Sequence, residues 1–134
     1  MLRIALLALL IVGTTCLAGC GSSTPAKPDR ESFLPDVNDL LEDLKSLLTS
    51  AKEAKKSPPG SNADLQQYEA TNPGATAAIA QGTIKYYYGQ GLSGGNKIVA
   101  HGAKCESEGG WVLLQDGTVK QMSADEFKAA PKAK

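Results

Sequence analysis

The sequence predicts an α+β fold in which an N-terminal amphipathic helix and short helices pack on a small antiparallel sheet of about four strands. Apolar residues follow helical spacing from about residue 35 to 52, and alternate with polar ones after about residue 83. Asp116-Gly117 then joins two alternating runs, as in a tight hairpin. Helical patterns therefore precede strand patterns in a chain of 134 residues, which favours one domain.

The first and longest helix is expected to begin at about Pro35 and to end before the Pro58-Pro59 pair. Acidic residues are concentrated at its start and lysines at its end, as the helix dipole favours. Its apolar stripe is wide, so we expect it to pack on the chain's own sheet; a coiled-coil partner helix is the alternative. The stripe contains Val37, Leu40, Leu41, Leu44, Leu47, Leu48 and Ala51.

Two short helices and two strands are expected next. Residues 61–68 and 75–81 predict the helices, and Gly82 fits the position that closes the second one. Residues 83–88 predict a strand with Lys85 and Tyr87 on one face. The residues expected on its other face are Ile84, Tyr86 and Tyr88. Residues 97–101 predict the second strand.

The hairpin is expected to pair residues 111–115 with residues 118–122 through a two-residue type I′ turn at Asp116-Gly117. That turn would place Leu113 opposite Lys120 and Trp111 opposite Met122. Ser123 and Glu126 then form a predicted capping box for a short final helix. Residues 129–134 are expected to be a polar tail.

Residues 1–19 have the pattern of a secretory signal peptide, with Arg3 before a short apolar run. The run Leu17-Ala18-Gly19-Cys20 resembles the lipobox of bacterial lipoproteins at every position. The resemblance implies that Cys20 receives a diacylglyceryl thioether, is exposed by signal peptidase II and becomes an acylated, for example palmitoylated, N-terminus. An ordinary secretory signal with a chance cysteine is the alternative.

This resemblance also implies a location. Gly21, and not aspartate, follows the cysteine, which is similar to lipoproteins exported to the outer membrane, facing the periplasm. Residues 20–34 are rich in Ser, Pro and charged residues, and predict a lipidated flexible linker before a domain at residues 35–128. We therefore expect a membrane partner through the lipid anchor, with the covalent lipid on Cys20 as the one attached group.

Composition excludes some functions. The 14 basic and 14 acidic residues balance, which argues against nucleic-acid binding. Of three cysteines, Cys16 lies in the signal peptide and Cys20 in the lipobox, which leaves Cys105 as the free thiol. His101 is four residues away, but the sequence shows neither four zinc ligands nor a third group to orient a Cys-His pair. We expect no metal, no other cofactor and no enzyme, with a small thiol enzyme as the weakest alternative.

Two further features invite binding hypotheses. The Gly-x-Gly-x-x-Gly stretch at residues 89–94 leads into a strand, so it offers no helix N-terminus to a dinucleotide, and kinase motifs are missing. It is therefore interpreted as a mobile hairpin loop. Tyr87 and Trp111 are instead the candidates for a ligand or partner surface, since alternate residues of the Tyr86 to Tyr88 run point to opposite faces.

The C-terminal part resembles a known group. The segment from Glu106 through Asp116-Gly117 to Val119 is similar to the signature of pseudopilin-like, prepilin-processing-associated proteins, although Glu106 stands where they have a histidine. The resemblance implies a helix packed across a small antiparallel sheet. A cleaved and lipidated chain cannot enter a pilus through an apolar N-terminal helix. We therefore expect a non-catalytic structural or binding module of the cell envelope, or an accessory, with an envelope protein partner, of a pseudopilin-type secretion or assembly system.

Overall fold

Helix α1, Val37–Glu53, is the longest element of the computed structural model, which describes residues 35–134. Asp36 caps its start by accepting the Asn38 N–H, and its apolar stripe is buried against the sheet and against α3, Pro73–Ala80. Packing on the chain's own sheet is therefore confirmed. The predicted signal peptide, the predicted lipidation site Cys20 and the predicted linker to residue 34 lie outside the described residues. Within residues 35–134, no helix is both long and apolar enough to cross a membrane.

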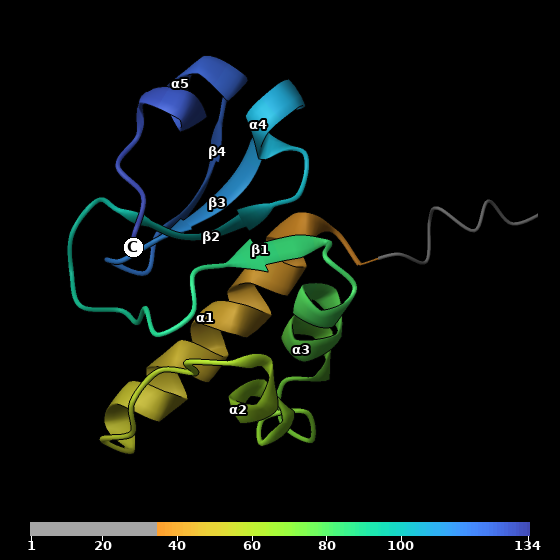
Figure 1. Cartoon of the computed structure of the whole chain (residues 1–134), viewed down its shortest axis with the longest axis vertical. Coiled ribbons are helices and arrows are strands. Elements are labelled where there is room, and N and C mark those ends of the chain that lie inside the picture. Colours follow the sequence, from red (N-terminus) through yellow and green to blue (C-terminus); the bar gives the residue numbers. More distant parts are fainter. Residues whose placement is uncertain (1–34) are drawn as a thin grey trace, which may run out of the picture.

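The sheet has four antiparallel strands in the order β1-β2-β3-β4, which confirms the predicted α+β fold. The strands are β1 (Ile84–Tyr86), β2 (Ile98–Gly102), β3 (Gly110–Leu114) and β4 (Val119–Met122). Short helices α2 (Asn62–Gln66), α4 (Cys105–Glu108) and α5 (Ala124–Ala129) complete the described fold. Figure 1 shows α1 and α3 below the sheet and α4 and α5 at its other end.

Two apolar clusters occupy the two faces of the sheet. The larger joins α1, α2 and α3 to residues such as Leu113, and the smaller surrounds Phe127 of α5 with Val112 and Leu114. Successive residues of β3 point to opposite faces, so this strand contributes to both clusters and is buried on both sides. Every residue from 112 to 114 is consequently buried, which an alternating pattern alone does not reveal.

A β-bulge in β2 determines which face of the sheet each residue of this strand points to. Ile98 lies opposite Leu114, but Ala100 lies opposite Leu113 and His101 opposite Val112, so β2 contains one extra residue between Ile98 and Ala100. The insertion places Ile98 and His101 on the same face although they are three residues apart. His101 therefore faces the α5 side of the sheet.

The predicted hairpin register is wrong by one residue. Trp111 lies opposite Gln121 and Leu113 opposite Val119. Leu114 donates its N–H to the Thr118 carbonyl at 2.9 Å, so the loop has three residues, and only Gly117 among them has a positive φ, 87°. The Asp116 carboxylate accepts the Thr118 N–H at 2.8 Å, which stabilises this turn without a left-handed Asp116. The longer loop brings Val119 onto the α1 face, where it packs on the larger cluster.

Local signals at other element ends are confirmed. Ser123 and Glu126 form the capping box of α5, and Gly82, with φ 75°, follows the end of α3. β1 ends at Tyr86 and is shorter than predicted; Tyr88 is 40% exposed with its ring edge-on to Tyr86. Helix α4 was not predicted, because four residues give no helical period.

The last residues are not a free polar tail. Ile98 donates its N–H to the Pro131 carbonyl and accepts the Ala133 N–H, both at 2.9 Å, in a parallel bridge to Lys132. Ala133 is buried. β1 is too short to extend alongside Ile98, and the C-terminal residues occupy that position on β2.

Candidate functional site: a lysine-rimmed groove

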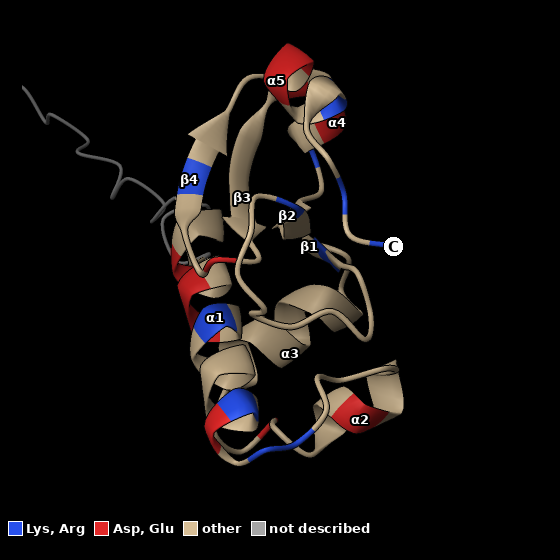
Figure 2. Cartoon of the chain, turned by 90° about the vertical axis from the view of Figure 1, so that its left-hand side faces the viewer, with Lys and Arg blue, Asp and Glu red and all other residues tan. Residues whose placement is uncertain are grey.

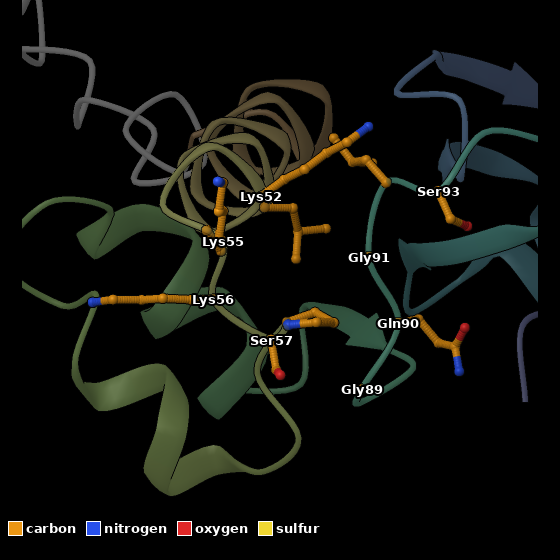
Figure 3. Close-up of a pocket in the computed structure, with 12 residues that line it drawn as sticks. Lys52, Lys55, Lys56, Ser57, Gly89, Gln90, Gly91 and Ser93 are labelled. Carbon is orange, nitrogen blue, oxygen red and sulfur yellow. The ribbon is translucent and has the colours of Figure 1, made fainter.

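A groove of about 590 Å³ lies between the C-terminal end of α1 and the loop at residues 89–93 (Figure 3). Its apolar part is aliphatic, and its rim carries lysines and small polar residues. The apolar lining is Leu48, Ala51, Pro58 and Leu92, and the remaining lining residues are Lys52, Lys55, Lys56, Ser57, Gly89, Gln90, Gly91 and Ser93. We refer to this feature as the lysine groove.

The end of α1 forms one wall. Lys56 donates its N–H to the Ala51 carbonyl at 2.9 Å and Lys55 donates to the Lys52 carbonyl at 3.0 Å, the two hydrogen bonds of a Schellman motif. Lys55 has φ 55° and is the only residue other than glycine with positive φ within residues 35–134. Helix α3 ends with the same pair of bonds, but there Gly82 takes the left-handed position. A lysine therefore stands where glycine has the lower backbone energy.

The glycine-rich loop forms the opposite wall. Gly89 donates its N–H to the Pro59 carbonyl at 2.7 Å, and the Tyr86 hydroxyl donates to the Gln90 carbonyl. A Cβ on Gly91 would lie 3.3 Å from Pro58 Cγ, so the loop passes close to the Pro58-Pro59 segment. The stretch predicted to be a mobile hairpin loop is thus tied to the chain that follows α1.

The groove is electropositive. Its lining includes three lysines and no carboxylate. In the described part of the chain these lysines form no ion pair and donate no side-chain hydrogen bond; the ion pairs there join Lys45–Glu42, Lys85–Glu106 and Lys104–Glu108. Figure 2 shows acidic residues at the start of α1, and at its end lysine together with the acidic Glu53, which does not line the groove. Lys52 points toward the loop that carries Gly91, whereas Lys56 points away from it (Figure 3).

His101 and Cys105 do not form a catalytic pair in this structure. His101 Nδ1 donates to the Gly102 carbonyl at 2.8 Å, and its ring lies 4.6 Å from that of Phe127. Cys105 Sγ donates to the Trp111 carbonyl at 3.3 Å. Both side chains are thus buried and bonded to backbone carbonyls rather than to each other.

Burial shifts both ionisation equilibria toward the neutral forms. Desolvation lowers the pKa of His101, an effect that the Gly102 carbonyl partly offsets. Desolvation raises the pKa of the Cys105 thiol, which reduces its thiolate fraction. No group of three or more metal-ligating side chains occurs within residues 35–134.

The two aromatic candidates form no aromatic pair within residues 35–134. Trp111 lies on the α1 face and packs on the larger cluster, together with Leu113. Tyr87 follows β1 and packs against both clusters, with its ring 5.9 Å from that of His101. Both side chains are only partly exposed, and the structure does not bring them together into one site.

Fold and groove define the class of protein as a small α+β domain with a cationic recess beside a glycine-rich loop. No protein-family model, no curated protein and no solved structure matches the chain.

Sequence reasoning missed the lysine groove. It assigned the lysines to the helix dipole and the glycines to a separate loop. More than 30 residues separate the two segments, and no residue pattern links them. The one available signal was local: the predicted end of the helix, at residues 53–57, contains lysines and no glycine to take the left-handed position.

Proposed function

We propose that this chain is a lipid-anchored protein of the bacterial cell envelope and that its α+β domain is a non-catalytic binding or structural module. The observation that carries the proposal is the lipobox at residues 17–20, followed by a short polar linker and then by α1. Two acyl chains, each adding about 0.8 kcal/mol per buried methylene, anchor a protein durably.

The chemistry of the domain supports a binding role over a catalytic one. The free thiol and the imidazole are buried and bonded to backbone carbonyls, and burial shifts the pKa of each toward its neutral form. A nucleophilic thiol needs a lowered pKa, and the pKa of Cys105 is raised. The lysine groove, in contrast, presents lysines that form no ion pair with any described residue, beside a concave surface with an apolar lining, as binding sites do.

Mass spectrometry of the protein purified from membranes tests the anchor. We expect an N-terminal peptide that begins at Cys20 and carries thioether-linked diacylglycerol. Cys20→Ser should abolish the modification and release the protein from the membrane fraction, whereas Cys105→Ser, as the matched control, should leave both unchanged. A bare Cys20 thiol in membrane-extracted protein would refute the proposal.

An accessory role in a pseudopilin-type secretion or assembly system is the second candidate. Its support is the arrangement of one long helix across an antiparallel sheet, which the C-terminal resemblance implies. Crosslinking in intact cells, followed by purification from detergent extracts, tests it. Reproducible recovery of secretion-system components with the wild-type protein favours this role. The control is Cys20→Ser protein that no longer fractionates with the membrane. Recovery of the same components with this control argues against a role at the membrane.

A further inference from the structure

We propose that the lysine groove binds an acidic peptide segment of a protein partner, with aliphatic side chains on the groove floor and carboxylates on the lysine rim. This inference rests on the proposed function and specifies the partner chemistry of the module. Its first support is charge complementarity: the lining includes three lysines without protein partners among the described residues, of which Lys52 points toward the facing loop, and it includes no acidic side chain. A concave surface of one charge sign concentrates ligands of the other sign.

The lining favours a peptide over a nucleotide or a sugar. The groove has no aromatic side chain on which a base or a sugar ring stacks. Pro58 and Leu92 instead offer partly exposed aliphatic surface, above the buried Leu48 and Ala51. Its volume of about 590 Å³ lies within the range of ligand sites. The N–H groups of Gly91 and Leu92 make no hydrogen bond to the protein within residues 35–134, so they are available to backbone carbonyls of a bound peptide.

The position of the groove favours a protein partner over the bilayer that holds the anchor. The linker joins α1 at Pro35, and the lysines lie at the other end of this helix of 17 residues, about 25 Å away. Figure 1 shows these two ends on different sides of the domain. The groove therefore lies on the part of the domain that is remote from the attachment point of the anchor.

The backbone of Lys55 adds an independent argument. Lysine at φ 55° is less stable than glycine, yet this conformation sets the ammonium-bearing side chain at the end of α1 beside the groove. Lys55→Gly should therefore increase stability and weaken binding. A purely structural role of this residue predicts no effect on binding.

The test is a binding titration with ¹⁵N-labelled full chain, purified from cells in nonionic detergent. The probe is a pooled decapeptide library that contains only Glu, Leu, Val, Ala and Gly, and the matched pool replaces Glu by Gln. We expect the acidic pool to shift the amide signals of Gly89, Gly91 and Leu92, and the Gln pool to leave them unchanged. Lys52→Gln and Lys55→Gly should each weaken binding by about fivefold, the effect of one partly exposed charge pair.

Lys128→Gln on the exposed side of α5 is the matched control and should bind as wild type does. The inference is overturned if the acidic pool gives no shifts at millimolar concentration, or if Lys128→Gln weakens binding as much as Lys52→Gln. It is also overturned if only anionic phosphatidylglycerol vesicles, and not peptides, shift these amides. The lipid on Cys20 is measured separately, by mass spectrometry. A failure of the anchor proposal can therefore be distinguished from a failure of the peptide proposal.

Discussion

Asp43 of α1 caps the start of α3: its Oδ2 accepts the Ala75 N–H at 2.7 Å, and its Oδ1 accepts the Asn72 side-chain amide at 2.9 Å. Asn72 is itself the N-cap residue of α3 but makes no capping hydrogen bond with its side chain. A residue 32 positions away thus satisfies an N–H that most helices satisfy locally. The contact holds α3 against α1 at the edge of the larger apolar cluster.

Asp43→Ala should lower the free energy of unfolding by about 1–2 kcal/mol, because it leaves the Ala75 N–H without its acceptor and leaves the buried Asn72 amide with only the Asp43 backbone carbonyl, 3.2 Å away. The exposed Asp39, also near the start of α1, is the control, and Asp39→Ala should cost only about 0.5 kcal/mol through the helix dipole. Urea denaturation measures both. Equal losses for the two variants would contradict a capping role.

Lys55→Gly should raise the free energy of unfolding by about 0.5–1 kcal/mol, because glycine adopts positive φ without steric conflict. The converse substitution at the end of α3, Gly82→Ala, should lower it by about 1 kcal/mol. A Cβ on Gly82 would have no atom within 4 Å, so the backbone conformation alone causes that loss. Thermal and urea denaturation test the pair, and a destabilised Lys55→Gly would refute the argument.

Stability should fall as the pH falls through the ordinary pKa of histidine, 6.5, toward the lowered pKa of folded His101. In that window the unfolded chain binds a proton that the folded chain does not, so stability is complete above pH 6.5 and declines by at most about 1.4 kcal/mol per pH unit below it. Urea titrations at pH 7.5 and pH 5.5 measure the change. His101→Gln, which cannot titrate, should show a smaller difference between the two values, and an unchanged pH dependence would exclude His101 as its source.

Cys105 should react slowly with a thiol reagent in the folded protein, because it is buried and its pKa is raised. Labelling of the folded protein with an aromatic disulfide at pH 7.5 should be at least about tenfold slower than labelling in concentrated urea. The reagent reaches a buried thiol only in the small fraction of molecules that are locally unfolded at any moment. Gly110→Ala would place a Cβ 3.1 Å from Cys105 Sγ, and it should accelerate labelling by displacing the thiol. Fast labelling of the native wild type would show that the thiol is accessible.

The sequence by itself determined the elements whose signals act over a few residues. The apolar stripe fixed α1, the Ser123 and Glu126 pair fixed the start of α5, and Gly82 fixed the end of α3. Each depends on contacts within one or two turns, and these contacts are largely independent of the rest of the fold. The lipobox is likewise a local motif, and its prediction rests on residues 17–20 together with the signal-peptide pattern of the residues before them.

The tertiary structure decided what depends on distant partners. The bulge in β2 turned His101 toward Phe127, and the three-residue turn placed Val119 opposite Leu113. Sheet register depends on burying two faces at once, and a shift of one residue exchanges those faces. The C-terminal residues pair with Ile98 because β1 stops short of it, and the lysine groove exists because the end of α1 meets a loop more than 30 residues later. Such pairings are chosen by the packing of the whole chain, so no local pattern encodes them.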